Sequence, residues 1–254
     1  MEPRIHPTAA VGYERAPAAY ELGRPSYPEE ATAVLAERLG AVPGRVVLDL
    51  AAGTGKLTRA LVATGADVVV VEPVAEMRAA LVGSLPAVRA LVGTAEDIPL
   101  EDGSVDAVAV GQAFHWFRGD EALAEIHRVL RPEGGLALVW NLRDETVPWV
   151  AELTRIMEPH RGGAPRAASG AWRDAFDRSA LFAPLKTATF RHVHRLTLEG
   201  VVARIASVSF VAALPESRRK QVLAEVRELV GGSTVELPYV TELSWTTRRA
   251  DARP

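Results

Sequence analysis

Two carboxylates, Asp49 and Glu72, lie at or near the ends of two apolar segments of the chain. A loop of small residues follows the first of these segments. Asp49 stands in the apolar run 46–50, and the loop 51–55 that comes next reads Ala-Ala-Gly-Thr-Gly. Residues this small let the backbone approach a ligand closely, because a larger side chain would collide with it. Glu72 ends a second apolar run about 20 residues after the loop begins, where a carboxylate accepts hydrogen bonds from ribose hydroxyls in nucleotide-binding folds. The pattern predicts a nucleotide-like cofactor site; the alternative for Glu72 is a structural role beside Pro73 at the start of a helix.

Parallel strands must bring these two carboxylates to one edge of a sheet. Apolar runs and helix-end signals predict strands at 45–50, 67–72, 88–92, 104–111, 136–140, 186–197 and 235–246. They also predict helices at 28–39, 55–64, 74–83, 119–130, 198–210 and 215–230. This alternation is typical of an α/β protein with a doubly wound sheet, in which ligands bind beyond the carboxyl ends of the strands.

Four blocks of the sequence, in order and spacing, resemble the class I S-adenosylmethionine-dependent methyltransferases. They are VLDLAAGTG at 47–55, VEP at 71–73, GTAEDIPL at 93–100 and RVLRPEGG at 128–135. The resemblance covers about residues 45–141 and implies a Rossmann-like, seven-stranded, mostly parallel sheet with its last strand antiparallel. It also implies S-adenosyl-L-methionine as the cofactor and S-adenosyl-L-homocysteine as the product. One departure is visible, because the family usually has Gly where this chain has Ala51.

The resemblance assigns cofactor roles to residues of these blocks. Asp49 would organise the loop and meet the cofactor's amino group, directly or through water, or else cap the next helix. Asp97 would accept a hydrogen bond from the adenine amine while the backbone of Ala95 and Glu96 frames the ring; the alternative is a polar loop before Ile98. The cofactor-binding set is completed by Ala51, Gly53, Gly55, Pro73, Met77 and Gln112.

The N-terminal residues extend the resemblance to one branch of the family. Tyr20-Glu21-Leu22-Gly23-Arg24-Pro25 and the run 113–117 are similar to segments of methyltransferases like trans-aconitate methyltransferase. In such enzymes the N-terminal segment covers the cofactor. We therefore expect residues 1–40 to form a lid segment, with Tyr20 and Arg24 near the methionyl carboxylate.

An aromatic run after the strand at 104–111 is the candidate wall of the substrate site. Phe114, His115, Trp116 and Phe117 lie at the carboxyl edge of the predicted sheet, near the reactive methyl group. We predict that Phe114 and Trp116 line the substrate pocket, where an aromatic face stabilises a cationic sulfonium. His115 is the candidate catalytic residue, a general base for a hydroxyl or amine. The alternatives are a hydrogen-bonding His115 and a Phe114 or Phe117 that belongs to the core.

A polar pair and an insertion complete the predicted substrate chamber. Asn141 and Arg143 follow the strand at 136–140 and could bind a polar or carboxylate group of the substrate, although Asp144 could instead pair with Arg143. Residues 144–184 interrupt the strand–helix alternation with amphipathic stretches at 147–160 and 171–180. We predict that this insertion is a helical cap over an enclosed, largely apolar pocket.

Composition limits the alternatives. The chain has 254 residues, which suits a single methyltransferase domain, and its net charge of −3 argues against a general nucleic-acid-binding surface. The sequence has no cysteine, no signal-peptide core and no apolar run of the roughly 20 residues that a membrane span needs. The six histidines are scattered, so we predict no metal site. We expect a cytoplasmic monomer or homodimer without membrane or nucleic-acid partners.

The sequence therefore predicts a methyltransferase that acts on a small molecule. The methyl group would pass by in-line displacement to a hydroxyl, carboxylate, amine or carbon of the acceptor. One alternative is a protein of this fold that binds the cofactor but catalyses another reaction, such as a cyclisation, or only binds a ligand. A further alternative is a methyltransferase for RNA or protein, which the net charge and the expected cap disfavour.

Overall fold

Seven strands form one sheet in the order β3-β2-β1-β4-β5-β7-β6. The structure is a computed structural model that describes residues 24–250 and 252. The strands are β1 (Val46–Leu50), β2 (Asp67–Val71), β3 (Arg89–Leu91), β4 (Val105–Gly111), β5 (Leu130–Arg143), β6 (Lys186–Thr197) and β7 (Thr234–Thr247). The strands β1 to β5 pair in parallel, and β7 runs antiparallel to both of its neighbours, β5 and β6. The predicted fold class, with its antiparallel last strand, is confirmed.

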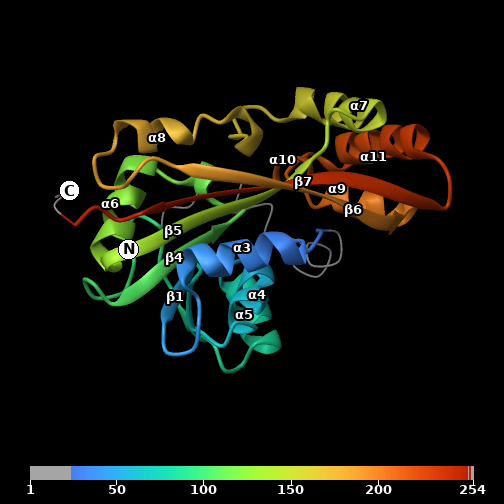
Figure 1. Cartoon of the computed structure of the whole chain (residues 1–254). Coiled ribbons are helices and arrows are strands. Elements are labelled where there is room, and N and C mark those ends of the chain that lie inside the picture. The colour runs from blue at the N-terminus through green and yellow to red at the C-terminus, as the bar shows by residue number, and fades with distance from the viewer. Residues whose placement is uncertain (1–23, 251, 253–254) are drawn as a thin grey trace.

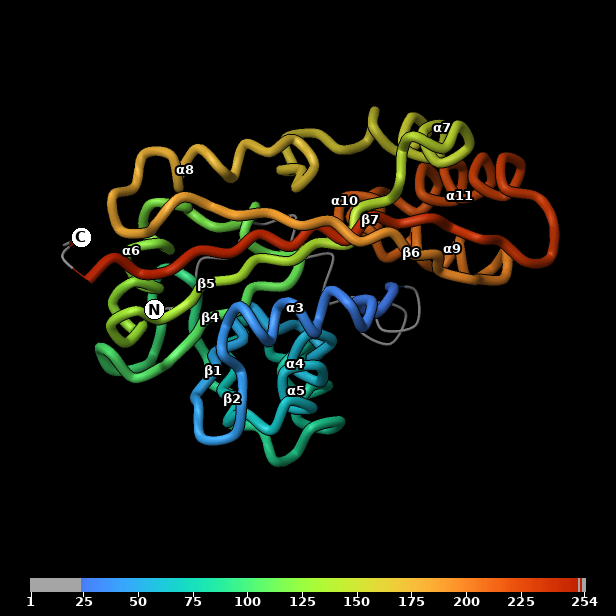
Figure 2. The backbone as a smooth tube through the Cα atoms, viewed as in Figure 1, coloured from blue at the N-terminus to red at the C-terminus, as the bar shows by residue number. Residues whose placement is uncertain are grey.

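Helices cover both faces of this sheet (Figures 1 and 2). One face carries α3 (Glu29–Leu39), α4 (Lys56–Val62) and α5 (Ala75–Ser84), and the other carries α6 (Gly119–Val129) and α8 (Arg173–Arg178). Alternate residues of β4 serve the two layers: Ala107 and Ala109 pack toward the first group of helices, Val108 and Val110 toward the second. Burial on both faces explains why the central strands read as continuous apolar runs.

The strand β5 is longer than the sequence predicts. Leu130 already pairs with Val105, although residues 131–135 carry the Pro and Gly residues that were expected to end a helix before a later strand. A register shift between Val105 and Ala107, together with a positive φ of 64° at Glu133, accommodates the irregular backbone there. The helix α6 ends at Val129, one residue before the end of the predicted helix 119–130.

A second body of helices stands on an extension of the sheet. The strand β5 pairs with β7 only up to Arg143 and Tyr239, whereas β6 and β7 continue to pair as far as Thr197 and Thr234. This overhanging ribbon and the helices α7 (Pro148–Met157), α9 (Leu198–Ala206), α10 (Ser209–Ala212) and α11 (Glu216–Val230) share a separate hydrophobic cluster. Figure 1 shows these helices grouped at one end of the sheet. We call this group the cap.

The cap and the lid differ from their predicted extents. Of the predicted cap insertion 144–184, α7 belongs to the cap, but α8 packs on α6 through Trp172 and Ala175. The rest of the cap comes from residues 198–230, between β6 and β7. In the predicted lid segment 1–40, α3 is a layer of the core, with Leu35 1% exposed. Within the described residues, no helix combines the length and apolar character needed to cross a membrane.

Candidate active site

The carboxylate of Glu72 fixes the small-residue loop between β1 and α4 through hydrogen bonds from backbone N–H groups. The backbone N–H of Gly53 donates to Glu72 Oε2 at 2.8 Å, and that of Val74 donates to Glu72 Oε1 at 2.9 Å. Gly53 has φ 58°, and a Cβ built on it has no heavy atom within 4 Å. The loop thus leaves an open space above Gly53 that a side chain would occupy.

One carboxylate oxygen of Asp49, which lies beside the loop, accepts no hydrogen bond from the described residues. Its side chain is fully buried; Oδ2 accepts a hydrogen bond from Thr58 Oγ1 at 2.6 Å, while Oδ1 has no partner. Burial raises the pKa of Asp49 to about 7; the hydrogen bond from Thr58 opposes that rise, and the charge of Glu72 adds to it. A buried carboxylate oxygen without a donor is costly, so this atom suits a cationic or N–H-bearing ligand group.

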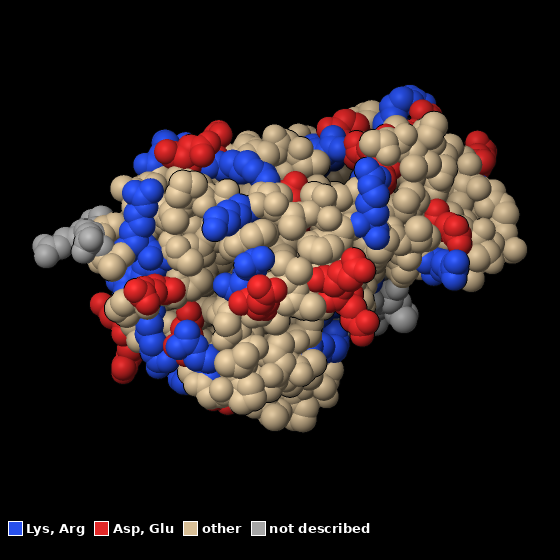
Figure 3. Space-filling view, viewed as in Figure 1, with Lys and Arg blue, Asp and Glu red and all other residues tan. Residues whose placement is uncertain are grey.

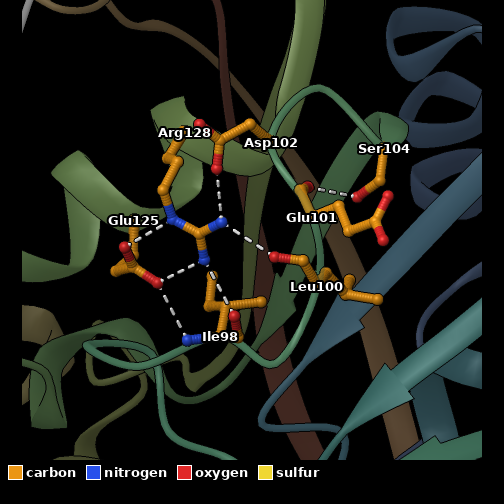
Figure 4. A network of polar contacts seen from close by, with 7 residues as sticks. All are labelled: Ile98, Leu100, Glu101, Asp102, Ser104, Glu125 and Arg128. Atoms are coloured by element: carbon orange, nitrogen blue, oxygen red, sulfur yellow. Dashed lines mark hydrogen bonds and ion pairs between the residues drawn. The ribbon is translucent and has the colours of Figure 1, made fainter.

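The turn after β3 is fixed by a polar network centred on Arg128 of α6 (Figure 4). Its guanidinium donates to the carbonyl oxygens of Ile98 and Leu100, both at 2.8 Å, and to the carboxylates of Glu125 and Asp102. Glu125 in turn accepts from the backbone N–H of Ile98 at 2.9 Å. The blocks 93–100 and 128–135, distant in sequence, are therefore parts of one structural unit.

Two adjoining hollows open at the carboxyl edge of the sheet. One runs along the loop beside Asp49, Ala51, Ala52, Gly53 and Thr54. The other, of about 440 Å³, lies between the ends of β4 and β5 and the cap. The two hollows share a wall that consists of Arg24, Gln112, Asn141 and Arg204. We call the larger hollow the cap pocket.

The cap pocket is more polar than the sequence predicted. Ten of its eighteen lining residues are polar or charged, and five of these are arginines. The prediction of an enclosed, largely apolar chamber is therefore wrong in both respects, since the pocket is polar and also opens to solvent. The reason is that loop 158–168 and helix α9 turn arginines inward, which the pattern of the predicted insertion did not show.

The amide of Asn141 is used by the protein itself. Its Nδ2 donates to the carbonyl oxygens of Pro25 and Ser26, both at 3.3 Å, and its Oδ1 accepts from Thr241 Oγ1 at 2.6 Å. These bonds tie the segment before α3 to β5. Asn141 therefore lines both hollows with its amide already hydrogen-bonded within the protein, and its predicted contact with the substrate stays a prediction.

Arg143 and Arg204 both line the cap pocket, close enough for their charges to interact. Arg143 ends β5, and its one hydrogen bond reaches Thr154 Oγ1 at 3.4 Å, while its Nε has no partner. Burial, and after it the nearby cation of Arg204, lowers the pKa of Arg143 to about 10. Arg204 is 7% exposed, and neither its Nε nor its Nη1 has a partner.

Sequence reasoning missed Arg204. A usable signal exists, because Arg204 lies among Val201, Val202 and Ile205 on the apolar face of α9, where a charged residue is unusual. Arg143, by contrast, is predicted because it lies three residues beyond the predicted strand 136–140, at the same edge of the sheet.

Comparison with known proteins decides the family. Residues 48–138 match a family model described as a methyltransferase domain. An uncharacterised methyltransferase of Mycobacterium tuberculosis is 43% identical over 242 residues, which cover 91% of this chain and 93% of the relative. The chain belongs to the class I S-adenosylmethionine-dependent methyltransferases.

Two further relatives agree with this assignment. An uncharacterised methyltransferase of Schizosaccharomyces pombe is 37% identical to the enzyme over 218 residues, covering 83% of this chain and 84% of the relative. The solved structure of a putative type II methyltransferase from Anaeromyxobacter dehalogenans is 25% identical, with a TM-score of 0.66 and coverage of 89% and 97%. The likeness to trans-aconitate methyltransferase stays a prediction.

The methyltransferase keeps His115 neutral. Trp140 Nε1 donates to His115 Nδ1 at 3.3 Å, so the proton of the neutral ring lies on Nε2. Burial, and then the cations of Arg24 and Arg161, lowers the pKa of His115 to about 3. A ring with this pKa and this tautomer is a hydrogen-bond donor at the pocket wall and a poor proton acceptor. The structure thus argues against the predicted general base.

The aromatic run of the methyltransferase divides between core and pocket. Phe114 is 1% exposed and packs against Phe117, Trp172 and Phe176, so its predicted place in the substrate wall is wrong. Trp116 lines the cap pocket, and its predicted contact with the substrate stays a prediction. Phe114 turns inward because the single 3-10 turn at 114–116 sends neighbouring side chains in different directions.

The remaining predicted cofactor residues hold varied positions in the enzyme. Ala51, Gly53 and Gln112 line the hollow along the loop, and Gln112 has a positive φ of 61°. Met77 is buried in α5, and a Cβ on Gly55 would contact Leu81 at 3.0 Å. Ala95, Glu96 and Asp97 form the turn after β3, where Glu96 accepts from the backbone N–H of Arg118, and Pro73 follows Glu72. Tyr20 lies outside the described residues, whereas Arg24 lines both hollows.

Proposed function

We propose that this enzyme methylates a small molecule that binds in the cap pocket, with S-adenosyl-L-methionine in the hollow along the loop. The observation that carries the proposal is the wall that the two hollows share. A pocket of about 440 Å³ suits a small molecule. Residues of loop 158–168, of α9 and of α10 line the pocket opposite the ends of the strands and add polar groups that a small molecule can contact.

The residues along the loop fit this cofactor. The free oxygen of Asp49 suits its amino group, Glu72 has lone pairs left for ribose hydroxyls, and Gly53 leaves room for the ligand. When bound, S-adenosyl-L-methionine supplies a methyl group activated by a cationic sulfur. Burial raises the pKa of Glu72 above its ordinary value, while the N–H groups of Val74 and Gly53 oppose that rise. Hydroxyl donors from a ribose would oppose it further.

The chain contributes position and desolvation. Among the described residues that line the cap pocket, the candidate bases are already engaged: Asp144 pairs with Arg191, and Glu145 pairs with Arg166. His115 is neutral and carries its proton on Nε2. The pocket therefore favours acceptors that offer a free lone pair or electron-rich carbon, such as a carboxylate, a neutral amine or an enolate. Holding the two reactants in line contributes to lowering the barrier by roughly 7–11 kcal/mol in favourable cases.

Calorimetry tests the cofactor site. The wild-type protein should bind S-adenosyl-L-homocysteine and not NAD. Glu72→Ala should weaken binding by about 1–3 kcal/mol through lost hydrogen bonds to the ribose and a looser loop. Glu76→Ala, which removes an exposed carboxylate from the neighbouring helix α5, is the matched control and should bind as the wild type does. Equal affinity in all three proteins would refute the assigned site.

A labelling experiment tests the reaction. The enzyme is incubated with methyl-labelled S-adenosyl-L-methionine and a cell extract separated into small-molecule, protein and RNA fractions. Label should appear in the small-molecule fraction. Label in protein or RNA would favour a macromolecular acceptor, and cofactor binding without transfer to any fraction would favour the alternative of another reaction.

A further inference from the structure

The lining of the cap pocket has an excess of positive charge that the rest of the protein does not share. Five arginines and two carboxylates line it, although the whole chain has a net charge of −3. On the outer face drawn in Figure 3, basic and acidic residues are interspersed. The positive charge is therefore a property of the pocket.

Most of the charged groups in the lining already have partners. Arg166 Nη2 lies 2.5 Å from Glu145 Oε1, and Asp144 pairs with Arg191. Arg161 pairs with Glu158 at 2.9 Å and lies over the ring of Phe210, 4.8 Å from its centroid. Both carboxylates of the lining are thus used.

Within residues 24–250, neither Arg143 nor Arg204 forms an ion pair with a carboxylate, although the charge of Glu145 is near enough to oppose the lowered pKa of Arg143. The hydrogen bond from Arg143 to Thr154 is long, at 3.4 Å, and three of the buried guanidinium nitrogens of the two residues have no partner: Arg143 Nε, Arg204 Nε and Arg204 Nη1. The two cations also repel each other, which is one cause of the lowered pKa of Arg143. Placing unpaired cations together in a buried site is unfavourable unless a ligand completes it.

We propose that the acceptor carries an oxyanion, a carboxylate or phosphate, and that Arg143 and Arg204 bind this group in the cap pocket. The inference rests on the proposed function, because it names the class of molecule that the cap pocket takes. Planar guanidinium groups match an oxyanion through paired, charge-assisted hydrogen bonds. Arg143 separates this site from the cofactor site, because it lines only the cap pocket, whereas Arg204 lines both hollows.

The test measures anion binding to the enzyme already saturated with S-adenosyl-L-homocysteine. Calorimetry compares acetate, succinate and benzoate with their neutral amides, and adds inorganic phosphate as a separate arm. We expect saturable binding of at least one of these anions and no binding of its amide. Arg143→Gln and Arg204→Gln should each weaken that binding about 10–100-fold.

Arg161→Gln is the matched control. It removes a cation from the same lining, but one that has partners, so it should change the anion affinity less than about threefold. If Arg143→Gln does not fold, Arg143→Lys keeps the charge but loses the planar fork and should bind the anion with intermediate affinity. Binding of phosphate but of no carboxylate would support the site and identify phosphate as its group.

Three results would overturn the proposal. They are a wild-type protein that binds S-adenosyl-L-homocysteine but no tested anion, amides that bind as well as the acids, and glutamine variants that match Arg161→Gln. The first result leaves the proposed cofactor site intact. A wild-type protein that fails to bind S-adenosyl-L-homocysteine would instead refute the proposed function.

Discussion

The hydrogen bond from Trp140 to His115 determines what that histidine can do at the pocket wall. With Nδ1 occupied and a pKa of about 3, His115 should stay neutral over the whole physiological range. Long-range proton–nitrogen NMR of the imidazole should therefore show the Nε2–H tautomer, without titration, between about pH 5 and 8. A titration of His115 near its ordinary value in the free enzyme would contradict this prediction and restore the general base.

Asp49 should make cofactor binding depend on pH. Its pKa of about 7 in the folded protein means that the carboxyl is largely protonated in mild acid. A protonated carboxyl cannot pair with the cofactor's ammonium group, so affinity for S-adenosyl-L-homocysteine should fall about tenfold for each pH unit below 7. Asp49→Asn should flatten this profile in calorimetry, and a flat profile in the wild type would argue against contact between the two groups.

The Asp49 carboxyl should lower the free energy of unfolding as the pH rises, whereas it should raise the affinity for the cofactor over the same range. The folded protein binds its proton more tightly than the unfolded chain, because the pKa rises from 3.8 to about 7 on folding. The contribution to the free energy of unfolding is therefore present below pH 3.8 and is lost as the pH rises through 7. In the ligand-free protein, Asp49→Asn should remove this loss, which denaturant unfolding at pH 5 and 8 can measure.

Ala51 is strained where relatives of the family usually have glycine. It has φ 57°, in the left-handed region where a Cβ costs roughly 1–2 kcal/mol. Ala51→Gly should therefore raise the free energy of unfolding by about 1 kcal/mol. Ala52→Gly is the control, since Ala52 has no positive φ and should lose stability instead. Equal effects of both substitutions in denaturant unfolding would contradict this account.

At the scale of single residues, the sequence predicts the groups that local patterns position. Asp49 and Gly53 follow directly from a strand and its loop, and the structure places both beside the first hollow. The use of Asn141 could not be predicted, because its partners Pro25 and Ser26 lie more than 100 residues away along the chain. Arg204 carries a local signal, a charge on the apolar face of α9, but the sequence does not show that this residue lies near Arg143.

Among the elements, α6 stabilises the turn after β3 through Arg128. Arg128→Lys keeps the charge but cannot reach two carbonyl oxygens and two carboxylates at once. It should lower the free energy of unfolding by about 1–3 kcal/mol and weaken S-adenosyl-L-homocysteine binding, because the preceding turn 94–97 loosens. Arg155→Lys, at an exposed ion pair on α7, is the control and should change stability by less than about 0.5 kcal/mol. An equal effect of both substitutions would mean that the network contributes little.

The boundaries of an element can be predicted where the alternation of polar and apolar residues determines them. They are harder to predict where pairing with a strand distant in sequence determines them. The strand β6 matches its predicted range, 186–197, because polar and apolar residues alternate along it. The strand β5 was predicted too short, because its pairing with Val105 overrides the Pro and Gly residues at 132–135. The sequence predicts a cap from the single insertion 144–184, because it does not show that residues 198–230 pack against α7.

At the scale of the molecule, ligands that bridge the sheet and the cap should restrain the cap. With S-adenosyl-L-homocysteine and a bound carboxylate present, amide exchange in 161–168 and 204–210 should slow by about tenfold or more. Exchange in the central strand β4 should not change, since this strand is already buried on both faces. Exchange in the cap that is insensitive to both ligands would mean that the cap pocket is not where they meet.

The overhang of β6 and β7 also bears on how such an enzyme can diversify. These two strands alone continue past β5, and residues 198–230 leave from the end of one strand and return at the start of the other. Insertions, deletions or exchanges in this excursion therefore need not displace Asp49 or Glu72. The ribbon is the junction at which residues 198–230 can be exchanged for those of a relative. Such a chimera should still bind S-adenosyl-L-homocysteine where the relative keeps an arginine at position 204, because Arg204 lines both hollows.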